Sequence, residues 1–160
     1  MRQSLHELAA LYQDSLFAAA FNICRNAQDA EDVIQDTFVQ YYTTKKEFEN
    51  EQHIRAWLIR VAINKAKNVS RTFWRRNRVS IADYMETQAF ESPESEDLFE
   101  TVMQLPEKYR IVIHLYYYED YSVSEIAKIL KLSQSNVKTR LMRGRAMLKE
   151  LLKGAWDDDK

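Results

Sequence analysis

The pattern of polar and apolar positions between residues 121 and 132 predicts a short amphipathic helix. Ser122 stands three residues before Glu125, which is the spacing of a capping box at a helix start. The apolar positions that follow recur every three to four residues and therefore share one side of a helix: Ile126, Ile129 and Leu130. The pattern stops at Lys131 and Leu132, where we expect this helix to end.

A second helix is predicted directly after the first. Ser133 can cap it, and on a helical wheel one side is apolar or small while the other is polar. The packed side is expected to carry Val137, Leu141, Gly144 and Leu148, and the outward side Ser135, Lys138, Thr139, Met142 and Arg143. A short helix, a tight turn and a longer helix are typical of the helix-turn-helix, whose second helix lies in the major groove of DNA. An ordinary helical hairpin with a solvated face is the alternative interpretation.

The N-terminal half shows helical periodicity over three further segments. Ser4 and Glu7 predict a capping box for the first, Asn26 can cap the second, and the third begins near Glu51 and continues through Trp74. The expected inward positions are Leu5, Leu8, Tyr12, Leu16, Ala19 and Ile23 in the first; Ala30, Val33, Ile34, Thr37, Phe38 and Tyr41 in the second; and Ile54, Trp57, Leu58, Val61 and Ala62 in the third.

Composition supports an all-α fold in a cytoplasmic protein. The 160 residues include only two Gly and two Pro, so the residues that tight hairpins need are scarce. No apolar run approaches the length of a membrane span, and charges interrupt the first 13 residues where a signal peptide needs an apolar core. The single Cys24 lies on an apolar helix face and is expected to be a buried thiol.

Charge is strongly segregated although the net charge is only -1. Every ionised side chain from residue 53 to 80 is basic, the segment 131–153 is basic apart from Glu150, and every ionised side chain from Asp83 to Glu107 is acidic. Residues 91–97, ESPESED, contain no apolar side chain and favour a flexible linker. We therefore predict domains at 1–80 and 98–160 joined by an acidic linker at 81–97. Two basic blocks on one chain indicate a duplex held at two places.

Two polar helix faces in the N-terminal half are candidate binding surfaces. Basic, amide and aromatic side chains interleave from Asn64 to Trp74, the mixture that binds phosphates and unpaired bases. A solvated helix end with its rings in the core explains the same pattern equally well. The helix after Asn26 has an acidic outer face, which is usually only a solvated surface. Its polar residues are Asp29, Glu31, Asp32, Gln35 and Asp36.

Five motifs in order resemble a bacterial extracytoplasmic-function (ECF) sigma factor of the sigma-70 family. They are DAEDVIQDTF at 29–38, AWLIRVAIN at 56–64, LPEKYR at 105–110, YSVSEIA at 121–127 and VKTRL at 137–141. Each motif alone is weak, but their order and separations are specific, and together they extend over nearly the whole chain. The resemblance implies two all-α domains, a promoter-melting domain (sigma region 2) and a C-terminal helix-turn-helix domain (sigma region 4).

The resemblance also implies residue roles. Core RNA polymerase is expected to bind Asp29, Asp32, Gln35 and Asp36. The melted minus-10 element is expected to contact Asn64, Lys65, Asn68, Arg71, Arg75 and Arg76, with Asn64 reading a flipped base and Trp57 belonging to the core. In the minus-35 element, Lys138, Thr139, Met142 and Arg143 are expected at base edges, and Gln134, Ser135, Arg140 and Arg145 at phosphates. An anti-sigma factor is a further implied partner; a cofactor, a metal or a catalytic residue is not implied.

Two features depart from the family pattern. Two other protein classes are alternatives to the sigma factor, a helical oxidase and a stand-alone DNA-binding regulator. Residues 133–136, SQSN, replace the small or Gly residues common at the start of the recognition helix, and the acidic loop 48–53 leaves the flipped base unidentified. A helical metal-carboxylate oxidase would need Glu three residues before His, a spacing that none of the three His residues has. A stand-alone helix-turn-helix regulator would bind DNA without polymerase, and the acidic helix at 29–36 argues for the sigma factor.

Overall fold

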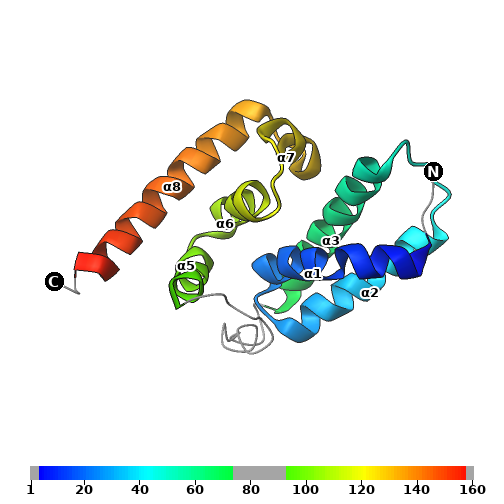
Figure 1. Ribbon diagram of the computed structural model, residues 1–160, viewed down its shortest axis with the longest axis horizontal. Coiled ribbons are helices and arrows are strands. Elements are labelled where there is room, and N and C mark those ends of the chain that lie inside the picture. The colour runs from blue at the N-terminus through cyan, green and yellow to red at the C-terminus, as the bar shows by residue number, and fades with distance from the viewer. Residues whose placement is uncertain (1–3, 74–92, 158–160) are drawn as a thin grey trace. The chain divides into compact units, whose positions relative to one another are not determined.

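The computed structural model describes the backbone of residues 4–73 and 93–157 and the side chains of residues 4–70 and 98–154. This part of the chain is helical, contains no strand, and divides into two compact units, Met1–Tyr84 and Met85–Lys160 (Figure 1). The all-α prediction is therefore confirmed. Each unit has its own core.

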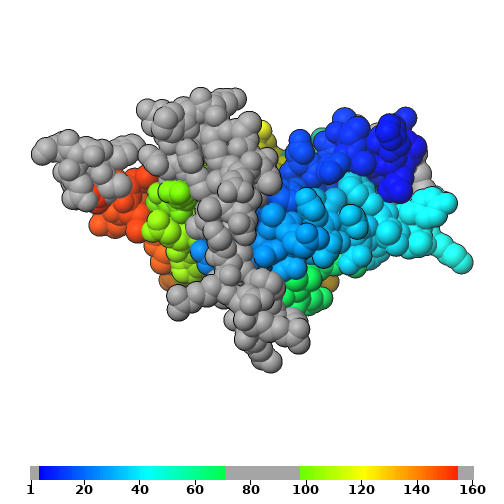
Figure 2. Space-filling model, turned by 90° about the horizontal axis from the view of Figure 1, so that it is seen from below, coloured from blue at the N-terminus to red at the C-terminus, as the bar shows by residue number. Residues whose placement is uncertain are grey.

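Three helices that pack against one another form the N-terminal unit: α1 (Leu5–Cys24), α2 (Ala27–Thr43) and α3 (Glu51–Phe73). Figure 2 shows α1 and α2 side by side over one face of this unit. The predicted caps are present, since Ser4 Oγ accepts from Glu7 N at 3.2 Å and Asn26 Oδ1 accepts from Asp29 N at 2.8 Å. The sequence did not predict the cap of α3, where Asn50 Oδ1 accepts from His53 N at 2.8 Å.

The core of the N-terminal unit follows the predicted stripes closely. Leu8, Leu16, Val33, Ile54 and Leu58 are each at most 1% exposed. The prediction is wrong for Leu5, which is 37% exposed because it opens α1. A side chain in the first turn of a helix lies beyond the neighbouring helices unless they extend past it. The inward positions of intermediate burial are Tyr12, Phe38, Trp57 and Val61.

Aromatic and polar contacts tie the three helices together. The Trp57 ring meets the ring of the buried Phe48 edge-on at a centroid distance of 5.4 Å, so Trp57 packs against the core while remaining half-buried. Cys24 is buried, as predicted, and its thiol donates to Ala66 O at 3.7 Å. Tyr12 Oη donates to Glu51 Oε1 at 2.7 Å, and burial together with this bond raises the pKa of Tyr12 to about 12.

The C-terminal unit consists of α5 (Pro93–Met103), α6 (Glu107–Ile113), the one-turn π-helix η1 (His114–Tyr118), α7 (Val123–Leu130) and α8 (Gln134–Asp157). Helix α5 begins at Pro93, inside the segment 81–97 that the sequence predicts as linker. Proline at the first helical position and acidic residues in the first turn favour a helix start, which explains why the helix begins within this segment. Residues 81–92 lie outside the described part of the chain.

The motif LPEKYR contributes a structural arginine to this unit. Arg110 is 3% exposed, and its Nη1 donates to Leu105 O at 2.9 Å, which ties the turn before α6 to the helix. The neighbouring core residues Val112 and Leu115 are fully buried. This arrangement holds α6 as a fixed support for α8, the helix predicted to read DNA.

Candidate nucleic-acid interface

Local capping fixes the turn between α7 and α8. Glu125 N donates to Ser122 Oγ at 3.1 Å and Ser122 N to Glu125 Oε1 at 3.0 Å, so the predicted capping box is complete. Lys131 ends α7 in the left-handed region with φ 57°, a conformation that turns the chain sharply after a helix. Ser133 Oγ then accepts from Asn136 N at 3.0 Å and starts α8. The predicted helix-turn-helix is confirmed.

Helix α8 has the two-sided character that the wheel predicts. Val137 and Leu141 are at most 1% exposed, Gly144 is buried and Leu148 is half-buried. The opposite side is accessible. Of the residues predicted to contact the minus-35 element, Gln134, Ser135, Lys138, Met142, Arg143 and Arg145 are exposed, and Thr139 and Arg140 are of intermediate burial.

Gly144 lies where α8 packs against α6. A Cβ atom at this position would lie 3.1 Å from Ile113 Cγ1 and 3.5 Å from Tyr109 Cβ. A glycine inside a helix costs about 1 kcal/mol relative to alanine. At this position a Cβ atom would crowd the Ile113 side chain, which would have to shift by a few tenths of an ångström to accept it. The residue before Gly144 is therefore brought next to α6.

Each of the three arginines on α8 has a defined neighbour. Arg140 Nε donates to Asn136 Oδ1 at 3.1 Å, and Arg145 lies 5.7 and 5.8 Å from the ring centroids of Tyr116 and Tyr117. Arg143 donates to the phenolic oxygen of Tyr109, and this bond is the largest cause of the lowered pKa of Tyr109. The sequence analysis assigns no role to these three tyrosines. Tyr109 lies in the motif LPEKYR, and Tyr116 and Tyr117 lie in the run of tyrosines at 116–118, but neither pattern indicates an arginine partner.

Helix α3 presents the predicted minus-10 residues along one side. Asn64 and Asn68, one turn apart, are exposed, and Lys65 is of intermediate burial. Arg71 belongs to the last turn of α3, but its side chain is not described, and Arg75 and Arg76 lie outside the described residues. The structure therefore brings together three of the six predicted residues.

The acidic side of α2 combines exposed and half-buried carboxylates. Asp32, Gln35 and Asp36 are exposed, whereas Asp29 is of intermediate burial. The Oδ2 atom of Asp29 is buried and lacks a hydrogen-bond partner among the described residues. Burial, followed by the charge of Asp32, raises the pKa of Asp29. The outer side of α2 thus concentrates negative charge. Partial burial removes water from the Asp29 carboxylate and disfavours its charged form.

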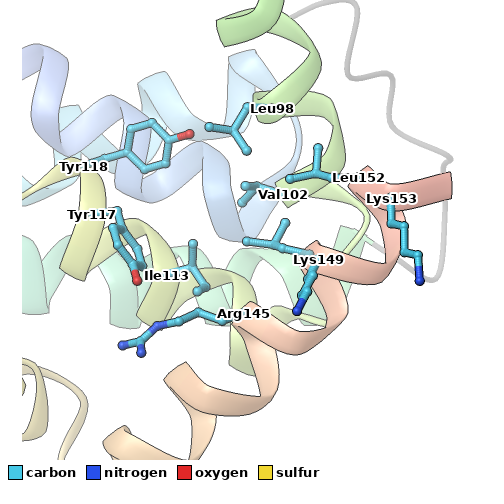
Figure 3. Close-up of a pocket in the computed structure, with 10 residues that line it drawn as sticks. Leu98, Val102, Ile113, Tyr117, Tyr118, Arg145, Lys149, Leu152 and Lys153 are labelled. Carbon is cyan, nitrogen blue, oxygen red and sulfur yellow. The ribbon is translucent and has the colours of Figure 1, made fainter. Parts of the chain in front are cut away.

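An apolar groove of about 710 Å³ opens on the C-terminal unit, bounded by α5, α6, η1 and α8 (Figure 3). Three cations, Arg145, Lys149 and Lys153, follow one another along α8 at one-turn spacing on its rim. The other lining residues are Leu98, Val102, Ile113, Tyr117, Tyr118, Leu148 and Leu152. The groove therefore combines an apolar interior with a basic edge.

Comparisons with known proteins agree with this architecture. Residues 8–79 match the family described as sigma-70 region 2, and residues 95–148 match the family described as sigma-70, region 4. None of the described helices is long and apolar enough to cross a membrane.

Relatives named as ECF RNA polymerase sigma factors are similar to this chain over most of their length. The ECF RNA polymerase sigma factor SigW of Bacillus subtilis is 27% identical over 92% of this chain and 88% of its own. The ECF RNA polymerase sigma-E factor of Escherichia coli K12 is 34% identical over 73% of this chain and 70% of its own.

Solved structures share the fold. CnrH, solved in complex with the cytosolic domain of CnrY, has a TM-score of 0.70 at 30% identity and covers 94% of this chain and 88% of its own. The sigma factor RpoE of Bartonella quintana, solved with the anti-sigma factor NepR, has a TM-score of 0.72 at 23% identity and covers 92% of this chain and 96% of its own. With both sigma regions matched and a relative 34% identical over most of its length, the chain belongs to the sigma-70 family as an ECF RNA polymerase sigma factor.

Proposed function

We propose that this sigma factor divides its work among three helix faces: α2 docks on core RNA polymerase, α3 holds the melted minus-10 strand, and α8 reads the minus-35 duplex. One observation carries the proposal. The described residues assigned to each task share one helix, and none of them is buried. Side chains with this exposure are available to a partner without loss of core packing.

Charge and spacing support the docking role of α2. Asp29, Asp32 and Asp36 stand three and four residues apart and therefore lie on one side of the helix. Asp32 and Asp36 are exposed, and Gln35 adds an uncharged hydrogen-bonding group beside them. A surface of this kind complements a basic partner surface, and such complementarity determines which partner binds and in which register.

Side-chain chemistry supports the minus-10 role of α3. The amide of Asn64 offers one acceptor and two donors, which suits the Watson–Crick edge of a base that has left the stack. Asn68 lies one turn further on the same side, and Lys65 supplies a cation for the strand backbone. Arg71, Arg75 and Arg76 complete the proposed strand contact.

The exposed side of α8 supports two kinds of DNA contact. Lys138 and Arg143 are exposed donors suited to guanine O6 and N7, and Thr139 can bond to a base edge. Met142 is 62% exposed in the same region, where its apolar side chain fits a thymine methyl group. The residues proposed to hold phosphates are Gln134, Ser135, Arg140 and Arg145.

The proposal places the chain in the cytoplasm, where core polymerase and promoter DNA are found, under the control of an anti-sigma factor. One solved neighbour, RpoE, was co-crystallised with the anti-sigma factor NepR, and another, CnrH, was solved in complex with the cytosolic domain of CnrY. The groove on the C-terminal unit supports this part of the proposal. Its apolar interior and its basic rim fit a regulator helix with one apolar side and acidic flanks.

Transcription from a promoter library with purified core enzyme tests the proposal. The chain plus core polymerase should start transcripts at promoters that share a minus-35 and a minus-10 element, and neither component alone should do so. Tight, sequence-specific footprinting by the free chain at physiological salt, without transcription in the presence of core enzyme, would instead identify a stand-alone regulator.

A further inference from the structure

The close packing of α6 on α8 brings a tyrosine beside the proposed base reader. Tyr109 packs against α8 at Gly144, with 3.5 Å between Tyr109 Cβ and the position of a Cβ at Gly144, an ordinary contact distance. Arg143 precedes Gly144 in the chain and is exposed. Its neighbour on α6 is therefore determined by the backbone packing of two helices rather than by a flexible surface contact.

Tyr109 is a well-fixed acceptor for this arginine. The residue is only 7% exposed, and Lys108 Nζ lies 5.1 Å from its ring centroid. Arg143 donates to the phenolic oxygen, and the charge of Lys108 acts on the same group. A packed ring presents its hydroxyl in one place, so the guanidinium that bonds to it loses much of its rotational freedom before DNA arrives.

Arginine has enough donors for both contacts. The guanidinium carries five N–H groups in a planar fork, and a bidentate bond to guanine O6 and N7 uses two of them. The remaining donors can stay on Tyr109. A side chain that is held in this way reads a base more selectively than a mobile one, because the guanidinium cannot move to form hydrogen bonds with a different base.

We propose that the Tyr109 hydroxyl positions Arg143 for the minus-35 base that it reads. Tyr109 itself is a positioning residue that acts through the arginine. The inference rests on the proposed function of Arg143 and deepens it by naming the group that orients the reader. Arg145 provides a contrast, because it lies over the rings of Tyr116 and Tyr117, and a ring needs no hydroxyl to attract a cation.

A double-mutant cycle on the holoenzyme tests this inference. Tyr109→Phe keeps the ring and removes only the hydroxyl, Arg143→Ala removes the reader, and Tyr117→Phe serves as the matched control. Binding of each holoenzyme is measured on promoters that carry all four base pairs at each minus-35 position. Thermal unfolding of each variant reports whether the fold is retained.

We expect Tyr109→Phe to lower discrimination at the position read by Arg143 by about three- to tenfold and to leave the other positions unchanged. In the Arg143→Ala background the same change should have no further effect. Tyr117→Phe should keep the parent's profile. Arg143→Lys, which retains the charge but lacks the fork, should lose discrimination at the same position and tests the reader independently of Tyr109.

Each other outcome overturns a defined part of the argument. If Tyr109→Phe keeps the parent's discrimination while Arg143→Ala loses it, the positioning role fails and the proposed reader stands. Equal effects of Tyr109→Phe with and without Arg143 would show that the tyrosine acts independently, which also overturns the inference. If Arg143→Ala keeps the full profile, the proposed reader itself fails, and the role of Tyr109 fails with it.

Discussion

Replacing Asn64 by Ala is expected to separate promoter melting from promoter binding. The side chain is exposed on α3, so its removal leaves the packed side of the helix unchanged. Alanine has the higher helix propensity, by at most about 0.7 kcal/mol. We therefore expect the free energy of unfolding to stay the same or to rise slightly.

The functional effect of this substitution has the opposite sign. An amide that both donates to and accepts from one base contributes about 1–3 kcal/mol, and Asn64→Ala removes it. Because 1.4 kcal/mol is a tenfold change, the open complex should become less stable by roughly 5- to 150-fold. The closed complex forms while the base is still stacked, so its affinity should be nearly unchanged.

Permanganate reactivity of unpaired thymines measures the open complex, and promoter binding at low temperature measures the closed one. Gln13→Ala is the matched control, since it removes an amide from an exposed position of α1, away from the residues proposed to contact DNA. It should behave like the parent in both assays. An equal loss of both complexes in Asn64→Ala would refute the reasoning and place Asn64 in the fold.

The charged sides of α2 and α8 and the core beneath α8 lead to four further expectations. Reversing the exposed Asp32 and Asp36 to Lys should weaken holoenzyme assembly by about tenfold in a core-binding titration, with thermal unfolding unchanged. Asp29→Asn should stabilise the chain at neutral pH, because burial and then the charge of Asp32 raise the pKa of Asp29 and ionisation therefore opposes folding. In urea unfolding this gain should be constant above the raised pKa and vanish as pH falls through the ordinary value of 3.8. Arg145→Ala should weaken all promoters alike and lower the salt slope of binding by roughly one unit. Leu141→Ala, at a position 1% exposed, should cost about 2–5 kcal/mol in urea unfolding and abolish minus-35 binding.

Each expectation has an outcome that contradicts it. Unchanged core binding in the Asp32 and Asp36 double variant would remove the docking role, and Asp14→Lys on α1, another exposed carboxylate, should have little effect. An Asp29→Asn variant no more stable than the parent at neutral pH would show that the carboxylate gains more from its surroundings than it loses. A changed base preference in Arg145→Ala would make it a base reader. A stable Leu141→Ala variant would show that the core beneath α8 can collapse around the missing side chain.

Local sequence signals were sufficient where a few neighbouring residues decide the outcome. Ser122 with Glu125, Asn26 and Ser133 begin helices where the sequence predicts, because a cap bonds to backbone groups two or three positions away. Apolar periodicity likewise identified Val137 and Leu141 as buried, since a helix has only one side that can pack. The same rule failed at Leu5, where burial depends on how far neighbouring helices extend.

Long-range contacts decided what the chain alone left open. The sequence showed a glycine inside a recognition helix, but only the packing of α6 on α8 places Ile113 close to Gly144 and brings Tyr109 to Arg143. Asp29 and Asp32 were both predicted on the outward side of their helix. In the folded unit Asp29 is partly buried, which raises its pKa. Helical periodicity determines which side of each helix faces inward, because it depends on neighbouring residues. Which side chains from different helices meet, and how much water remains around a charge, depends on the tertiary arrangement of helices distant in sequence.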